Sequence, residues 1–441
     1  MKQFVYTVAV VLMYLFFVQT GFTQQNNQYD IVFKGGHVID PANNINRVMD
    51  VAVKDGKIAR VAGNIPPEKA GKAIDIAVYY ITPGIIDIHT HIFYDSNSFK
   101  NIRSVIPDDV CPQSGCTTVV DAGTPGADTF EDFKYIHDTF TNRTRVFAFI
   151  NIAAPGMGRA EQNPLLFDVQ KAVAMARKYP DMIVGFKTAH YWGGESNPYD
   201  EIHTPWASVD SVLAAGKAAG LPVMFDVRLR PPQDGYPARS FREHYLVKAR
   251  PGDIQTHCFG KPHYIIREDG TVNPDYLKAR ERGIVFDVGH GAGAFWFRNA
   301  VRAVKQGFLP HSISTDLHLS SVAGSAINMT NVMSKFLCMG VPLEDVIRRS
   351  TVNPARVINH PELGTMSEGS TADIAILELL TGNFSYTDVG GGKLSGDRRL
   401  NCVMTLFGGR IVYDPTGLNA TEWSTIPKDS PYWDRTTKQN Y

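Results

Sequence analysis

Eight short apolar segments recur between residues 81 and 318, and they constrain the fold more than any other feature of this 441-residue chain. Helical stretches such as SVDSVLAAGKAAG (208–220) and FRNAVRAVKQG (297–307) separate several of them, each with glycine where the helix should end. Strands that alternate with helices form parallel sheets, and eight such units close into a barrel. The sequence therefore predicts an α/β fold, a TIM-like (β/α)8 barrel. The segments are 81–93, 115–123, 145–153, 182–190, 221–227, 253–260, 283–291 and 311–318.

The chain on either side of the barrel has a different pattern. Residues 29–65 contain short β-branched strands separated by Gly, Asn and Asp turns, which is typical of antiparallel β structure. The same pattern returns in ADIAILEL, from Ala372, and in CVMTLFGGRIVYD, from Cys402. We infer that both termini pair into one small β-sandwich, into which the barrel is inserted. The predicted parts are a signal peptide (1–24), the sandwich (25–82 and 363–423), the barrel (83–362) and a surface tail (424–441).

The first 24 residues have one lysine, a long apolar core and a polar exit, which is typical of a secretory signal peptide. An uncleaved anchor is the alternative, but the apolar core is shorter than the about 20 residues that span a bilayer. Cleavage near Gln24 would give a periplasmic or secreted protein with no stable membrane span. Equal numbers of basic and acidic residues, 44 each, indicate neither a nucleic acid nor a membrane surface as partner.

The five cysteines are odd in number and scattered, so they do not describe a disulfide framework. A loop closed by Cys111 and Cys116 stays possible. We expect the cysteines to be small buried apolar side chains.

Metal-ligand side chains follow several of the predicted strands. In ITPGIIDIHTHIF, His89 and His91 share one face, because alternate side chains of an extended chain point the same way. Such pairs also occur on ordinary surface strands, but this one ends an apolar run typical of a strand covered on both faces. Buried ionisable groups are costly unless they are paired or bound to a metal, so a cluster at one barrel end predicts a metal centre. Later strands end with further candidate ligands: Lys187, Asp226, His257 and Asp316.

This order of ligands resembles that of the amidohydrolase superfamily, and the resemblance covers residues 29–414. Within it, GFKTAH, THCFG, FDVGHG and ISTDLH resemble dihydroorotase-like deacetylases, some of which cleave acetyl esters of hydroxy acids. The resemblance implies two divalent metal ions, zinc first and manganese or iron as alternatives. It also implies that Lys187 is carboxylated by carbon dioxide and bridges them. The alternative for Lys187 is a plain salt bridge.

Asp226 departs from the family pattern, because most relatives have a histidine there. With a carboxylated Lys187, Asp316 and a bridging hydroxide, Asp226 would make a site of two divalent ions neutral. We therefore expect a less Lewis-acidic metal and a shift toward manganese or iron. The alternative is that Asp226 binds no metal and the site holds one ion.

The resemblance assigns proton transfer to Asp316. A metal lowers the pKa of bound water, and Asp316 would accept the proton of the attacking water and return it to the leaving group. Asp316 could instead cap the following helix. Candidate substrate-binding residues lie near or just beyond strand ends, and the arginines among them could pair with a substrate carboxylate. They are His190, Arg228, Arg230, His290 and His318. The alternative is a core histidine for His290 and a solvated surface charge for each of the others.

Together these features predict a secreted metal-dependent hydrolase that cleaves an amide or ester bond of a small, carboxylate-bearing molecule. Deacetylation is the first expectation. Hydrolysis of a cyclic amide, as in dihydroorotases and hydantoinases, and a catalytically inactive metal-binding relative are the alternatives. No Gly-x-Ser-x-Gly segment is present, which disfavours a serine hydrolase. We expect a homo-oligomer.

Overall fold

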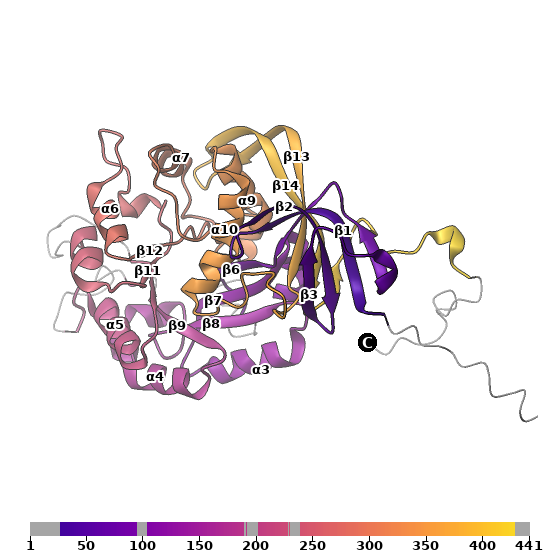
Figure 1. The fold of residues 1–441 in the computed structure, drawn as a ribbon. Coiled ribbons are helices and arrows are strands. Elements are labelled where there is room, and N and C mark those ends of the chain that lie inside the picture. Colours follow the sequence, from indigo (N-terminus) through magenta and orange to yellow (C-terminus); the bar gives the residue numbers. More distant parts are fainter. Residues whose placement is uncertain are drawn as a thin grey trace, which may run out of the picture.

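The computed structural model describes residues 27–94, 104–188, 191, 202–227, 229 and 239–427. The predicted signal peptide and the candidate residues His190, Arg228 and Arg230 lie outside the described residues. Figure 1 shows two parts: parallel strands with helices along their outer side, and a second sheet built from both ends of the chain. Among the described helices, none is long and apolar enough to cross a bilayer.

The central sheet consists of parallel strands in chain order, as predicted. Parallel bridges also join Ser312 to Asp287 and Leu317 to Thr90, so residues 312–317 link the last strand to the first. These bridges close the ring and confirm the TIM-like barrel. The strands are β6 (Ile85–Thr90), β7 (Cys116–Gly126), β8 (Arg145–Asn151), β9 (Ile183–Thr188), β10 (Val223–Phe225), β11 (Ile254–Gln255) and β12 (Val285–Phe286).

The two helices predicted from glycine at their ends are present. Helix α5 (Ala207–Ala219) ends at Gly220, which has φ of 71°, and α7 (Phe297–Lys305) is followed by Gly307, with φ of 78°. Only glycine adopts this left-handed conformation without strain. The remaining described α-helices are α2 (Pro107–Val110), α3 (Phe130–Phe140), α4 (Val169–Lys178), α6 (Pro274–Glu281), α8 (Leu319–Val322), α9 (Met329–Cys338), α10 (Leu343–Ser350) and α11 (Val352–Val357).

The second sheet joins both termini, because β5 pairs with β13 in antiparallel register. It is mixed rather than wholly antiparallel, since β1 pairs with β4 and β5 in parallel. Ile58 of β3 and Leu406 of β14 share one buried core although their strands lie far apart in the sheet, so the sheet curls as a sandwich does. Its strands are β1 (Tyr29–Asp40), β2 (Ile45–Lys54), β3 (Lys57–Ala62), β4 (Ala70–Asp75), β5 (Tyr80–Pro83), β13 (Ile374–Thr387), β14 (Lys393–Phe407) and β15 (Arg410–Tyr413).

The hairpin of β13 and β14 reaches beyond this sheet to the barrel, which the sequence did not predict. Figure 1 shows both strands beside α9. The backbone N–H of Leu400 donates to Ser334 Oγ at 2.9 Å, and Lys335 Nζ donates to the carbonyl of Thr387 at 2.9 Å. The small domain therefore contacts a helix of the barrel through this hairpin.

All five cysteines are unpaired, and four of them are buried. The expectation of buried apolar side chains is confirmed for those four. Cys338 is half-buried, and no disulfide closes the loop between Cys111 and Cys116.

Candidate metal centre

Three of the predicted ligands converge at the carboxyl end of the barrel strands. His89 is the second-last residue of β6, His91 follows it by two residues, and Asp316 lies near the end of the segment that closes the ring. One ligand atom from each lies within 4.8 Å of the other two. His91 Nε2 is 3.0 Å and His89 Nε2 3.6 Å from Asp316 Oδ1. The alternation of the extended chain thus places both imidazoles against one carboxylate.

The outer nitrogens of both histidines bond to threonines. His89 Nδ1 lies 2.7 Å from Thr256 Oγ1, and Thr256 itself donates to Asp287 Oδ2 at 2.8 Å. Since the Thr256 proton goes to Asp287, His89 carries its proton on Nδ1 and leaves Nε2 free to bind. His91 Nδ1 lies 2.8 Å from Thr124 Oγ1. Such outer bonds orient metal-binding histidines. No sequence signal indicates these threonines, because threonine is an ordinary residue in and beside barrel strands.

Lys187 lies in the same cluster, near the end of β9. Its side chain is 1% exposed, and Nζ is 3.4 Å from His89 Nε2. Burial lowers the pKa of Lys187, while the carboxylates of Asp226 and Asp316 oppose that shift. A Cβ at Gly123 would stand 2.6 Å from Lys187 Cγ, so the absence of a side chain there makes room for the lysine.

His257 and Asp226 complete the group on the side of β10 and β11. His257 Nε2 is 3.8 Å from Asp316 Oδ2, and His257 Nδ1 is 3.8 Å from Asp226 Oδ1. Both His257 and Asp316 have positive φ, 57° and 50°, which is uncommon outside glycine and is concentrated at functional sites. The structure thus brings all six predicted ligands to one end of the barrel.

The cluster has the chemistry of a cation site. Asp316 Oδ1 and His257 Nε2 are buried and have no hydrogen-bond partner among the described residues. The contact of His91 Nε2 with Asp316 Oδ1, at 3.0 Å, is an ion pair only when that imidazole is protonated. A buried polar atom without a partner costs about 1–3 kcal/mol, so a protein rarely keeps several together without a ligand. Burial also lowers the pKa of His89 well below its ordinary value, which keeps that imidazole neutral and able to bind a metal. The residues present therefore fit a divalent metal.

Asp316 does not cap the following helix, because the N-cap of α8 is His318. His318 Nδ1 lies 2.8 Å from the backbone carbonyl of Asp316, and its side chain is partly exposed beside the site. The helix-cap alternative for Asp316 is therefore wrong.

His290 lies behind the site and is fully buried. Its Nδ1 is 2.9 Å from the carbonyl of Gly291, and its Nε2 is 2.7 Å from Lys335 Nζ. Both ring nitrogens are therefore engaged within the protein, as in a core histidine. No sequence pattern indicates Lys335, since it meets His290 only through the packing of α9 in the folded chain.

Comparisons with known proteins agree with this geometry. Residues 297–412 match the model of the amidohydrolase family. The chain is 31% identical over 346 residues to a deacetylase of Agrobacterium fabrum, covering 76% of this chain and 80% of that protein. Its fold is similar to crystal structures of an adenine deaminase (TM-score 0.77, 26% identity, 88% and 100% covered) and of a dihydroorotase (TM-score 0.71, 26% identity, 87% and 99% covered). With its ligand order, barrel and curled second sheet, the chain belongs to the amidohydrolase family.

Proposed function

We propose that this protein is a metal-dependent deacetylase that hydrolyses an acetyl ester or amide of a small, carboxylate-bearing molecule. The observation that carries the proposal is the convergence of His89, His91 and Asp316 around buried atoms without partners. The identity to a deacetylase over most of both chains supports the choice of acyl group. Residues 1–24 support secretion or a periplasmic location, which N-terminal sequencing of the mature protein would test.

The proposed site holds two divalent ions, with zinc as the first choice and manganese or iron as alternatives. His89, His91 and Asp316 would hold one, His257 and Asp226 the other, and a carboxylated Lys187 would lie between them. The contact of Lys187 Nζ with His89 Nε2 and its full burial support this place. Asp226 contributes a negative charge where a histidine would be neutral. This charge makes the bound metal less Lewis-acidic and raises the relative suitability of manganese or iron.

When bound, the metal supplies Lewis acidity that polarises the acetyl carbonyl and makes a water acidic. Asp316 accepts the proton of that attacking water and then donates it to the departing oxygen or nitrogen, so the products are acetate and the free hydroxy or amino acid. Thr256 and Thr124 hold the two imidazoles in orientation through their outer nitrogens. His318, bonded to the Asp316 carbonyl, lies where it could contact the substrate.

The test compares substrate classes on the purified protein after its metals have been counted by mass spectrometry. Acetate release from acetylated hydroxy and amino acids should exceed hydrolysis of dihydroorotate, hydantoins and adenine. Intact-mass measurement should show an added carboxyl that is absent from Lys187→Ala. Faster turnover of the cyclic amides would replace the deacetylase proposal by the dihydroorotase-like one. Bound metal without turnover of any substrate would indicate an inactive relative.

A further inference from the structure

Lys335 and His290 form a buried pair behind the metal centre that no step of the proposed hydrolysis uses. Lys335, on α9, is fully buried, and its Nζ lies 2.7 Å from His290 Nε2. The same Nζ donates to the carbonyls of Ser325 at 2.6 Å and Thr387 at 2.9 Å. An ammonium has three N–H donors, and here three acceptors receive them. Burial lowers the pKa of Lys335 to about 7 and Asp388 opposes the shift, while the three acceptors favour the charged form.

This contact fixes the tautomer and the orientation of His290. Because Lys335 donates to Nε2, the ring proton of a neutral His290 is on Nδ1, where it donates to the Gly291 carbonyl. The imidazole also stacks on Phe295, with ring centroids 4.5 Å apart. Lys335 Nζ lies 5.6 Å from the centroid of Phe295, which adds a cation–π contact. His290 is therefore held through both ring nitrogens and one ring face.

His290 in turn carries the backbone that borders Asp316. The N–H of His290 donates to the carbonyl of Ser314 at 3.2 Å, and that of Gly291 to the carbonyl of Thr315 at 2.9 Å. A Cβ at Gly291 would stand 2.2 Å from Asp316 Oδ2, so this backbone is in close contact with the carboxylate. A displacement of His290 would therefore displace the wall against which the Asp316 carboxylate rests.

The hairpin of the small domain supplies part of this arrangement. Thr387, which accepts from Lys335, is the last residue of β13. The next residue, Asp388, accepts from the backbone N–H of Phe297 at 2.9 Å, which anchors the hairpin tip at the start of α7. Both contacts join the second sheet to the catalytic end of the barrel.

We propose that Lys335 is a positioning residue for the hydrolysis, which locks His290 and thereby sets the place of the Asp316 carboxylate with the help of the β13–β14 hairpin. The inference rests on the proposed function only where kcat is measured. It means that the contact between Lys335 of the barrel and Thr387 of the hairpin serves catalysis.

The first test compares Lys335→Met with Lys393→Met, which changes an exposed lysine of the same hairpin. Misplacement of a catalytic group by about 1 Å can cost about 10²-fold in rate, so kcat of Lys335→Met should fall by about 10- to 100-fold. Its KM and metal content should stay close to those of the wild type, and Lys393→Met should keep wild-type kcat. A folded Lys335→Met with wild-type kcat would overturn the proposal.

A second variant separates positioning from stability. In the double variant His290→Phe, Lys335→Met, apolar side chains of similar shape replace both partners, so no imidazole nitrogen is left unpaired and thermal stability should rise above that of Lys335→Met. The carbonyls of Ser325 and Thr387 lose their donor in the single and the double variant alike. Low kcat at the higher stability supports positioning. Recovery of kcat together with stability would reduce Lys335 to a structural role and overturn the proposal.

A third readout does not need a substrate. The absorption spectrum of the cobalt-substituted protein reports the ligand geometry of the metal, and it should change in Lys335→Met but not in Lys393→Met. An unchanged spectrum in Lys335→Met would overturn the positioning role. A changed spectrum in a protein with no deacetylase activity would support the positioning role and overturn the proposed function alone.

Discussion

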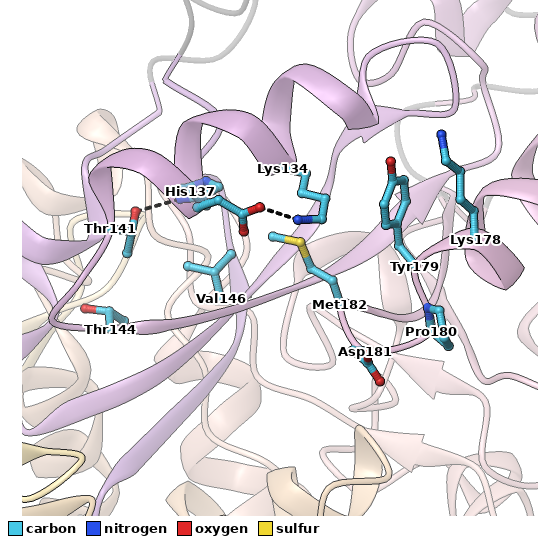
Figure 2. A pocket seen from close by; sticks show the side chains of 11 residues that line it. Lys134, His137, Thr141, Thr144, Val146, Lys178, Tyr179, Pro180, Asp181 and Met182 are labelled. Carbon is cyan, nitrogen blue, oxygen red and sulfur yellow. Dashed lines mark hydrogen bonds and ion pairs between the residues drawn. The ribbon is translucent and has the colours of Figure 1, made fainter.

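The two ends of the barrel both carry groups of polar side chains, but these side chains differ in what they contact. At the carboxyl end of the strands, His89, His91 and Asp316 point at one another and leave buried atoms without hydrogen-bond partners. At the opposite end, a pocket of about 410 Å³ lies between the ends of α3 and α4 and the starts of β8 and β9 (Figure 2). It is lined by Lys134, His137, Asp138, Thr141, Thr144, Val146, Lys178, Tyr179, Pro180, Asp181 and Met182.

The polar side chains of this pocket largely bond to near neighbours. Lys134 pairs with Asp138 one helical turn away, and Figure 2 shows this pair beside the bond from His137 to Thr141. Lys178 pairs with Glu131 across the neighbouring helices. Exposed pairs of this kind contribute little stability and leave no ligand set converging on one point. The comparison teaches that converging atoms without partners identify a site better than the volume of a cavity does.

The largest difference in kcat is expected between two carboxylate substitutions, one at each end of the barrel. Asp316→Asn removes the proposed proton acceptor, and loss of general acid–base catalysis costs about 10²- to 10⁴-fold in kcat. Asp138→Asn, in the pocket of Figure 2, should leave kcat near the wild-type value because it removes only an exposed ion pair. Steady-state kinetics on both folded variants measure the contrast. Equal losses would break the distinction between the two ends.

A smaller effect on kcat is expected from alanine substitution of one of two glycines that have the same type of backbone conformation. Gly291 and Gly307 both have positive φ, 55° and 78°, so alanine strains each, at about 1–3 kcal/mol. Only at Gly291 would the new Cβ meet Asp316, while at Gly307 it would meet open space. Gly291→Ala should therefore lower kcat by about 10- to 100-fold, whereas Gly307→Ala lowers stability alone. Similar kcat values in both variants would show that backbone strain, not contact with Asp316, is what matters.

The sequence predicted that the candidate ligands converge at one end of the barrel, because the signals for them are local. Each candidate ligand lies at or just beyond the carboxyl end of a predicted strand, and the carboxyl ends of parallel strands must meet, so His89, Lys187 and Asp316 are expected to lie together from the sequence alone. The same reasoning recovered α5 and α7 from their terminal glycines. Local signals of this kind predict both the strand order and the place of the candidate ligands.

What the sequence could not predict depends on contacts between distant segments. Lys335 meets His290 and Thr387 only because α9 packs between the barrel and the hairpin, and no pattern around Lys335 indicates this. The length of the hairpin was also missed, since strands that pack on a helix of another domain have the same composition as strands of a sandwich. Thr256 and Thr124 gave no signal because a threonine in a strand is ordinary.

A further test of the catalytic end changes its one departure from the family pattern. Asp226→His exchanges a carboxylate for a neutral imidazole beside His257 and adds net positive charge to the proposed site. Activity should be retained, and kcat with zinc should rise relative to kcat with manganese or iron when the variant is compared with the wild type. Reconstitution of the metal-free variant with each ion measures this preference. An unchanged preference would indicate that Asp226 does not reach the metal.

The smallest effect on kcat is expected from substitution of His137, which lines the pocket of Figure 2. The same substitution should clearly change how stability depends on pH. Burial lowers the pKa of His137 to about 4, against an ordinary value of 6.5, so the folded protein keeps this imidazole neutral. As the pH falls through 6.5, the unfolded chain binds a proton that the folded chain refuses, and stability is lost down to about pH 4.

The expected loss from His137 between pH 7 and pH 5 is about 2 kcal/mol in the free energy of unfolding. His137→Asn has no titrating group and keeps a donor for the bond to Thr141, so its urea denaturation midpoint should depend less on pH than that of the wild type. Its kcat at pH 7 should be unchanged, because the opposite end of the barrel is untouched. A loss of activity in this variant, with stability intact, would mean that the two ends are coupled and that the pocket takes part in function.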